Sequence, residues 1–410
     1  MSKEATKGSI EATAHDFGGN PLYPHPPRSI DFVSARSRSK LRAAIVQSCP
    51  RVPGVYGMVD HHGELIYVGK SKSLRSRLLS YFADSNSGEK GGRIVRKARM
   101  IQWETQPSEF ASLLREQQLI RRFTPQWNVQ GVPKRQRPVY LCLGRRPAMF
   151  FVTAKPPKEC TAVEGPFYGQ ARMKLAVDAL NKVFLLRDCS NKQLFHFADQ
   201  MDLFEMTYRP GCLRLETETC LGPCAAGCSH EQYDRAVNAA ESFMDGFNNE
   251  PLVYIQDSFE RAIENRQYEL AGRHHETLKS LQYVDRKLTL LNSARRQYTF
   301  IYGVEGFDGL GIWYLIHSGE IADMMPAPTP ATLANPRWVS KAEDRLSQWN
   351  GATKNRLDRG HGPYPHTLAI VASWFRKNRR ELKERTFLPV DALSALEKST
   401  TPRNGKTKIA

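Results

Sequence analysis

The sequence predicts an α+β fold for the front of the chain, with a small antiparallel sheet flanked by helices. Residues 52–59 and 64–68 are rich in β-branched and aromatic residues, and the turn residues Asp60-His61-His62-Gly63 separate them, as in a β-hairpin. Two amphipathic patterns of helical period follow, within 74–82 and 108–123. Strands and helices mixed in this way predict one domain built around a sheet.

The hairpin brings two tyrosines together. With His61 and His62 at its tip, Tyr56 lies directly opposite Tyr67, and the Cβ atoms of such a pair are roughly 4.5 to 5.5 Å apart. We interpret the two histidines as exposed turn residues rather than ligands. The hairpin therefore presents a pair of phenols on one face.

The first predicted helix starts after Ser73, a residue suited to an N-cap. Leu74, Leu78 and Tyr81 recur at helical spacing and form its buried stripe, and Arg77 falls at the edge of that stripe. The helix therefore carries one guanidinium beside its buried face.

The second predicted helix spans Ser108 to Phe123. Its apolar face comprises Phe110, Leu113, Leu114, Ile120 and Phe123. Glu116 falls on the same face, where a carboxylate is costly unless it is paired or binds a cation. Glu109, near the helix start, is expected to lie in water.

These segments resemble the GIY-YIG nuclease superfamily, and above all the N-terminal domain of the UvrC family of excinucleases. The similar stretches are Pro53-Gly54-Val55-Tyr56, Ile66-Tyr67-Val68-Gly69-Lys70-Ser71-Lys72, Leu74–Phe82, and Leu113-Leu114-Arg115-Glu116 through Pro125-Gln126-Trp127-Asn128. The resemblance implies that Tyr67 is the general base or activator of the attacking water and that Tyr56 is its partner. It also implies that Lys70 and Arg77 hold the scissile phosphate, and that Glu116 is the one protein ligand of a divalent metal, Mg²⁺ or Mn²⁺.

Phosphodiester hydrolysis accounts for this combination of side chains. The reaction needs an activated water, positive charge around the developing pentacovalent phosphate and a stabilised leaving oxygen. Tyrosine, with a pKa near ~10, is a poor base at neutral pH, so Lys70, Arg77 and a metal on Glu116 are the means of favouring its phenolate. A single glutamate suffices because Mg²⁺ keeps most of its waters. Tyrosines in a hairpin often only pack, but the complete set in order favours catalysis.

The charge of the chain fits a nucleic-acid target. It has 59 Lys and Arg against 42 Asp and Glu, a net charge of +17, and residues 41–140 carry 17 basic against 7 acidic residues, a surplus of 10. We predict that Lys72 and the cluster Arg93, Arg96, Lys97 and Arg99 contact DNA phosphates without reading sequence. The alternative is a basic helix that is only solvated.

Five of the eight cysteines crowd into 40 residues: Cys189, Cys212, Cys220, Cys224 and Cys228. This clustering suggests a bound metal rather than disulfides. Resemblance to UvrC implies that Cys189, Cys212, Cys220 and Cys224 hold a [4Fe-4S] cluster. Zinc is the alternative for four thiolates. The long segment between Cys189 and Cys212, and the additional Cys228, depart from the family pattern.

Residues 256–291 are predicted to form a helical hairpin. Leu278, Leu281, Val284, Leu288 and Leu291 line one face of its second helix. The segment resembles the UVR motif through which UvrC binds UvrB, with Tyr268-Glu269-Leu270-Ala271 at its centre. The resemblance implies a UvrB-type partner, and UvrA indirectly, whereas a generic antiparallel helix pair is the alternative.

The predicted organisation has six parts. They are a disordered leader (1–38), a GIY-YIG domain (39–135), a linker with the Cys-rich iron–sulfur region (136–235), the UVR-like hairpin (250–293), a C-terminal domain of unknown role (298–395) and a disordered tail (396–410). The last hundred residues hold no second acidic cluster and no helix-hairpin-helix glycine pattern, so the RNase H-like module of UvrC is not expected. No apolar run approaches ~18 residues, which predicts a soluble, cytoplasmic protein without membrane contact.

Together these observations predict a metal-dependent endonuclease that nicks one DNA strand, on the 3′ side of damage in nucleotide excision repair. Two alternatives remain. One is a free-standing GIY-YIG nuclease of mobile-element or recombination type, and the other is a DNA-binding protein that has kept the fold without catalysis.

Overall fold

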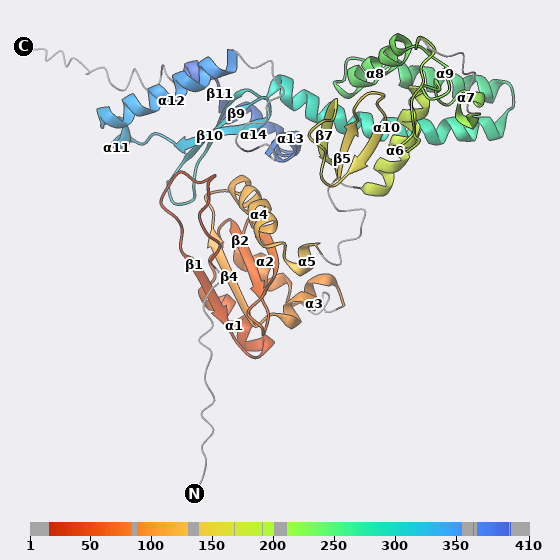
Figure 1. Ribbon diagram of the computed structural model, residues 1–410. Coiled ribbons are helices and arrows are strands. Elements are labelled where there is room, and N and C mark those ends of the chain that lie inside the picture. The colour runs from red at the N-terminus through yellow and green to blue at the C-terminus, as the bar shows by residue number, and fades with distance from the viewer. Residues whose placement is uncertain are drawn as a thin grey trace, which may run out of the picture. The chain divides into compact units, whose positions relative to one another are not determined.

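A computed structural model describes residues 16–83, 88–129, 139–167, 169–190, 192–200, 211–354, 364, 367–392 and 394 (Figure 1). The chain divides into two compact units. The first combines residues 1–131 with 295–410, and the second comprises residues 132–294. The predicted tail, 396–410, lies outside the described residues.

The first unit is built on a four-stranded antiparallel sheet of order β1-β4-β2-β3. Its strands are β1 (Ile30–Ser34), β2 (Gly54–Val59), β3 (Leu65–Ser71) and β4 (Met100–Thr105). The helices around it are α1 (Arg38–Ser48), α2 (Leu74–Ser80), α3 (Lys90–Lys97), α4 (Glu109–Phe123) and α5 (Gln126–Val129). The predicted hairpin and both predicted helices are therefore present.

The two faces of this sheet bury separate apolar clusters. On one face α1, α2 and α3 cover side chains that include Tyr56, Met58 and Trp103. On the other face Leu119 of α4 and Phe17 pack against β2 and β3. Because β3 is an edge strand, its outward backbone groups need partners from elsewhere.

The register of the hairpin differs from the prediction. Tyr56 pairs with Gly69, and Met58 pairs with Tyr67. The loop closes between Val59 and Leu65, and a bulge then shifts the register by one residue. The two tyrosines are diagonal neighbours rather than directly opposed, and they remain on one face because their partners are two residues apart.

The predicted disordered leader is wrong for the described residues 16–38. Phe17 is fully buried, and β1 pairs with β4 along its whole length. Arg115 donates hydrogen bonds to the carbonyl oxygens of Gly18 (2.6 Å) and Gly19 (3.0 Å). It also forms a buried ion pair of 2.8 Å with Glu104. A guanidinium with five donors thus fixes a segment that has almost no regular structure of its own.

The segment of the predicted C-terminal domain, 298–395, has its own sheet and helices, and residues 295–410 are grouped with the first sheet in one compact unit. They contribute the sheet β10-β9-β8-β11, with β8 (Phe300–Val304), β9 (Ile312–His317), β10 (Glu320–Pro326) and β11 (Thr386–Phe387). Their helices are α11 (Pro330–Leu333), α12 (Pro336–Lys354), α13 (Leu368–Lys377) and α14 (Arg379–Glu384). We call the described part of this segment the C-terminal module.

Phe110 joins the C-terminal module to α4. Its ring is fully buried and lies 5.2 Å from the rings of Tyr302 and Tyr314 and 5.3 Å from that of Trp374, measured between centroids. Such aromatic contacts add to the stabilisation from apolar burial. The helix that carries Glu116 and the C-terminal module therefore share one core.

Phe110→Ala should lower the free energy of unfolding by about 3 to 5 kcal/mol, because it leaves a cavity in a core that both parts share. Urea denaturation followed by tryptophan fluorescence measures the change. Phe307→Ala is the matched control, since Phe307 is 48% exposed and should cost less than about 1 kcal/mol. Equal losses in the two variants would contradict the shared core.

The second unit contains a three-stranded antiparallel sheet of order β6-β5-β7. Its strands are β5 (Val139–Leu143), β6 (Phe150–Thr153) and β7 (Ala162–Phe167), and its helices are α6 (Gln170–Val183), α7 (Leu213–Glu216), α8 (His230–Met244), α9 (Glu250–Glu264) and α10 (Tyr268–Gln297). The prediction of a linker over this region is therefore wrong. A sheet with its own helices precedes and surrounds the cysteines.

Helix α10 follows α9 after three residues, in the region of the predicted helical hairpin, and the hairpin itself stays a prediction. The three residues between them include Arg266 with a positive φ of 57°, and Phe259 stacks on His275 with 5.3 Å between ring centroids. All five predicted stripe residues of α10 are buried. None of the helices in the described part of the chain is both long and apolar enough to cross a lipid bilayer.

Candidate active site

Three phenols gather where β2, β3 and α2 meet. Tyr56 is buried, and its hydroxyl lies 2.6 Å from that of Tyr81. The Tyr67 ring lies 6.2 Å from the Tyr56 ring and 6.4 Å from the Tyr81 ring, between centroids. A Cβ atom on Gly69 would lie 2.5 Å from the Tyr56 hydroxyl, so glycine at this position makes room for the cluster.

Burial keeps Tyr56 and Tyr67 protonated in the free protein. It raises the pKa of Tyr67 above the ordinary value, and the neighbouring Tyr81 and Glu116 raise it further, whereas Arg77 lowers it. The pKa of Tyr56 is raised for the same first reason. The side chains alone therefore do not make Tyr67 a phenolate at neutral pH.

Arg77 lies beside the phenols, as its position at the edge of the helical stripe predicted. Its guanidinium carbon is 5.1 Å from the centroid of the Tyr81 ring, a cation–π geometry. Ser73 begins the helix, but its side chain makes no capping hydrogen bond. Instead its hydroxyl lies 3.0 Å from that of Ser76.

Glu116 approaches the phenols from α4 at the free edge of β3. One carboxylate oxygen accepts a hydrogen bond of 3.0 Å from the backbone N–H of Lys70. Burial raises the pKa of this carboxyl to about 7, against opposing effects of Lys70 and Arg77. Among the described residues Glu116 forms no ion pair. A buried carboxylate is costly unless it is paired or binds a cation.

Glu109, the second carboxylate of α4, is predicted to lie in water, but the structure places it in two ion pairs. The two carboxylate oxygens of Glu109 form ion pairs with the ammonium groups of Lys70 (3.0 Å) and Lys72 (2.9 Å). The Glu109 side chain is only 23% exposed. These lysines lower its pKa, although burial opposes them. The predicted phosphate-binding Lys70 is thus held by an acid that lies about two helical turns before Glu116.

Two residues of the site were not singled out from the sequence. Tyr81 was assigned to the buried stripe, yet its hydroxyl completes the phenol cluster. Asn128 accepts a hydrogen bond from the Val68 N–H (2.7 Å) and donates one to the Val68 carbonyl (2.8 Å). Asn128 therefore pairs with backbone groups at the edge of β3 next to Tyr67. Glu116 does the same for the backbone N–H of Lys70, two residues further along the strand.

The predicted DNA-contacting side chains Arg93, Arg96, Lys97 and Arg99 are exposed on or just after α3. Lys97 lies over the Trp127 ring, 5.5 Å from its centroid. Lys72 is also exposed despite its ion pair with Glu109. All five are accessible to a ligand, and their contact with DNA remains a prediction.

The cysteine cluster is only partly assembled. Burial raises the pKa of the Cys220 thiol to about 11, and the thiols of Cys212, Cys189 and Cys224 are near enough to raise it further. The Gly222 N–H also points at the Cys220 sulfur, at 3.3 Å. In the part of the chain that the structure describes, however, no three His, Cys, Asp or Glu side chains are grouped as a metal site requires.

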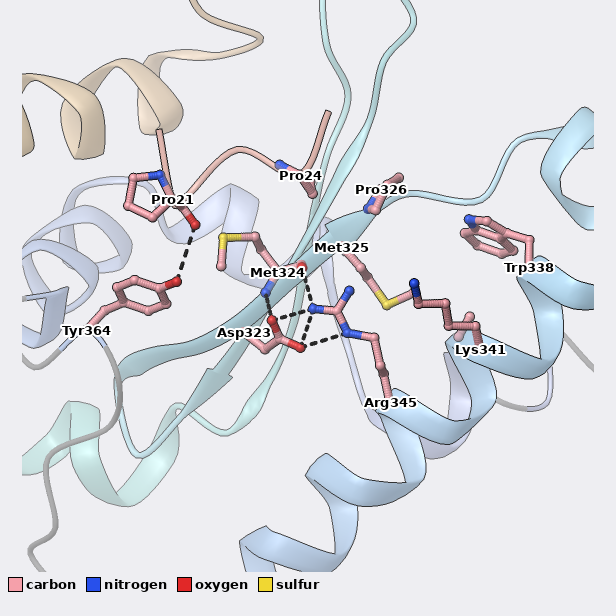
Figure 2. Close-up of a pocket in the computed structure, with 11 residues that line it drawn as sticks. Pro21, Pro24, Asp323, Met324, Met325, Pro326, Trp338, Lys341, Arg345 and Tyr364 are labelled. Carbon is pink, nitrogen blue, oxygen red and sulfur yellow. Dashed lines mark hydrogen bonds and ion pairs between the residues drawn. The ribbon is translucent and has the colours of Figure 1, made fainter. Parts of the chain in front are cut away.

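A cavity of about 490 Å³ lies in the first unit, away from these groups (Figure 2). Arg345 and Asp323 close a two-pronged ion pair inside it, with nitrogen–oxygen distances of 3.0 and 2.5 Å. The Tyr364 hydroxyl donates to the Pro21 carbonyl at its rim. The charges of Arg345 and Asp323 inside the cavity neutralise each other, and none of the predicted site residues lines the cavity.

Comparisons with known proteins fall on both units. Residues 52–129 match the UvrC-like GIY-YIG domain, and residues 139–243 match the middle domain of UvrC/Cho excinucleases. The UvrABC system protein C of Francisella philomiragia is 28% identical over 72% of this chain and 45% of its own length. That of Chlamydia abortus is 28% identical over 64% and 41%. The chain thus spans less than half the length of these relatives.

Solved structures match the nuclease-like segment alone. The GIY-YIG N-terminal endonuclease domain of UvrC from Thermotoga maritima, bound to magnesium, is 34% identical to this chain. The match covers 22% of this chain and 97% of that domain, with a TM-score of 0.20. A point mutant of the same domain, also bound to its catalytic divalent cation, is 33% identical over 22% and 93%, again with a TM-score of 0.20.

Proposed function

We propose that this chain, which matches the UvrC-like GIY-YIG domain over residues 52–129 and the middle domain of UvrC/Cho excinucleases over residues 139–243, is a DNA endonuclease. It nicks one strand by metal-dependent hydrolysis of a phosphodiester. The observation that carries the proposal is the buried Glu116 carboxyl, which forms no ion pair with another described residue and lies near Tyr67 and Arg77. This carboxyl lowers the stability of the fold when it is ionised, because a buried charge costs free energy, so a purely structural role does not explain it.

Each side chain has a role that its geometry permits. Glu116 would hold a divalent cation, which when bound supplies positive charge at the scissile phosphate and the leaving oxygen. Arg77 would reach the phosphate from α2. Lys70 would do so by leaving Glu109 for the phosphate, whose single negative charge grows as the pentacovalent transition state forms. Tyr67 would orient the attacking water. Where a bound cation and Arg77 favour its phenolate, Tyr67 would first release its own proton to solvent and then accept the proton of the water, while the Tyr56–Tyr81 hydrogen bond fixes the cluster around it.

A nicking assay on supercoiled plasmid, with and without Mg²⁺, tests the reaction. We expect the open circular form only when Mg²⁺ is present. No nicking under either condition would favour the non-catalytic DNA-binding protein.

The place in repair is tested with the UvrA and UvrB proteins. We propose incision on the 3′ side of a lesion presented by a UvrB-type partner, which binds the α9–α10 hairpin. This hairpin carries exposed apolar side chains, Val253 (53% exposed), Tyr254 (61%), Ile263 (45%) and Tyr268 (69%), as a docking surface requires. Mapping the nick on a lesion-bearing duplex checks the side. Nicking that is indifferent to UvrB, with no UvrB retained in a pull-down, would favour the free-standing nuclease.

Cation dependence should vary with pH in a defined direction. Because the pKa of Glu116 is raised to about 7, protons compete with the cation below that pH. The Mg²⁺ concentration for half-maximal nicking should therefore be about tenfold higher at pH 6 than at pH 8. Nicking rates over a Mg²⁺ titration at both pH values measure the shift. Equal half-maximal concentrations would show that Glu116 does not bind the cation.

The four-cysteine cluster is a separate proposal. We predict that protein purified without oxygen shows the visible absorption of an iron–sulfur centre, and that Cys220→Ser loses it, because Cys212, Cys189 and Cys224 are near enough to raise the pKa of the Cys220 thiol. Metal analysis gives the iron content. The control is Cys142→Ser, which replaces a buried cysteine of the β5 strand outside the four-cysteine cluster. Stoichiometric zinc without iron would replace the cluster by a zinc site.

A further inference from the structure

A strongly basic surface lies at the end of α13 and on α14, outside the predicted active site. Six exposed basic side chains occur within ten residues, Arg376, Lys377, Arg379, Arg380, Lys383 and Arg385. The two glutamates of the same segment are already engaged. Glu384 pairs with Arg380 at 2.8 Å, and Glu381 accepts a hydrogen bond from the Tyr302 hydroxyl. We call these six side chains the α13–α14 surface.

Several side chains of this surface have no neutralising partner among the described residues. Arg376, Lys377 and Lys383 make no side-chain hydrogen bond or ion pair with other described residues. Clustered like charges repel one another and gain most from a ligand that carries several negative charges. The segment also presents no exposed aromatic side chain, since Trp374 and Phe375 are buried beneath it.

The α13–α14 surface is fixed next to the predicted active site. Its helix α14 is tied to β8 by the Glu381–Tyr302 hydrogen bond. Tyr302 in turn packs on Phe110, the residue after Glu109. The Glu381 carboxylate lies near enough to Lys72 to add to the effect of Glu109 on that ammonium. Helix α14 therefore lies within electrostatic reach of Lys72, one of the two lysines paired with Glu109.

We propose that the α13–α14 surface binds the phosphate backbone of duplex DNA beside the nick, and that the C-terminal module is a DNA-positioning part of the nuclease. The inference rests on the proposed function in one respect, that the substrate is DNA. Arginines and lysines without exposed aromatics suit phosphates of a duplex, whereas single-stranded DNA is bound largely by base stacking. The shared core around Phe110 connects the C-terminal module to α4, the helix that carries Glu116.

Equilibrium binding of the full-length chain to an undamaged 30-base-pair duplex, without divalent cations, tests the surface apart from cleavage. The triple variant Arg376→Ala/Lys377→Ala/Lys383→Ala should weaken binding about ten- to hundredfold at 150 mM salt. The slope of log Kd against log salt should also fall by about 2 to 3, because three phosphate contacts are lost. The control is Lys155→Ala/Lys158→Ala/Lys174→Ala, which removes three exposed charges from the other unit and should leave both values within about twofold of the unmodified chain.

Lysine acetylation adds a measurement that does not depend on the variants folding. Bound duplex should protect Lys377 and Lys383 of the unmodified chain at least about threefold more than Lys155 and Lys158. Unchanged affinity in the triple variant together with absent protection overturns the proposal, even if the chain nicks plasmid. So does an acidic protein that protects these lysines when DNA does not. Binding and protection without any nicking would instead support the surface and refute the nuclease.

Discussion

Replacing Glu116 by glutamine should abolish nicking, with a loss of at least about a thousandfold, while DNA binding stays within about threefold. The amide keeps the size of the side chain and can still accept the hydrogen bond from the Lys70 N–H, but it removes the charge that attracts a cation. Electrostatic stabilisation of this kind is worth several kcal/mol in the transition state. Single-turnover nicking of plasmid at saturating Mg²⁺ measures the loss.

The same substitution should make the protein more stable. In the folded state the pKa of Glu116 is raised to about 7 from an ordinary value of 4.5. The carboxyl therefore favours the folded state when protonated, and that contribution is lost as the pH rises from about 4.5 to about 7. At pH 8 Glu116→Gln should raise the free energy of unfolding by up to about 3 kcal/mol, and at pH 4 the gain should vanish.

Glu109→Gln is the matched control on the same helix. Its carboxylate is held by Lys70 and Lys72, so its removal should change nicking by less than about tenfold and should not stabilise the protein. Nicking by Glu116→Gln at the unmodified rate, or an equal loss in Glu109→Gln, would move the proposed cation site away from Glu116.

The local features of the site could be predicted because each depends on neighbours in the sequence. The helical period placed Arg77 beside a buried stripe and Glu116 on an apolar face. Ser108 caps α4, with its hydroxyl accepting the Ala111 N–H at 3.1 Å. Where a pattern of three or four residues decides the structure, the sequence alone was sufficient.

Long-range contacts could not be predicted in the same way. No periodicity marks Phe17, a single apolar residue among glycines and prolines, and its burial depends on Leu119, about a hundred positions away. The pairing of Glu109 with Lys70 and Lys72 requires the end of β3 to meet the start of α4. The hairpin register failed for a local reason, since the bulge before Tyr67 inserts one residue with no glycine or proline there to signal it.

The bulge and the C-terminal module nevertheless serve the same site. The shifted register places Gly69, rather than Tyr67, opposite Tyr56. The space above Gly69 then accepts the Tyr56 hydroxyl and its bond to Tyr81. On the other side, Phe110 ties the helix of Glu116 into a second core. Catalytic geometry thus depends on features that are remote in sequence, as preorganised sites commonly do.

Tyr67→Phe should lower nicking by about a hundred- to ten-thousandfold, the usual range for a side chain that transfers a proton in the transition state. Burial, with Tyr81 and Glu116, raises the pKa of the Tyr67 phenol above its ordinary value. Tyr67 can act as a base only in its phenolate form, which is favoured only where a bound cation and Arg77 offset that effect. Phenylalanine keeps the ring and leaves no large cavity, so stability should change by less than about 1 kcal/mol.

Tyr56→Phe separates a role at the water from a role in the cluster. The Tyr56 hydroxyl is bonded to Tyr81, so its removal loosens the cluster but leaves Tyr67 able to meet the water. The nicking rate of Tyr56→Phe should therefore be at least about tenfold higher than that of Tyr67→Phe. Rates measured from pH 6 to pH 10 at saturating Mg²⁺ add a second readout, because only Tyr67→Phe should remove the rise of rate with pH that titration of the phenol produces. If Tyr67→Phe keeps both the rate and the pH profile of the unmodified chain, the water is activated by another group, and the phenol cluster serves only to shape the pocket.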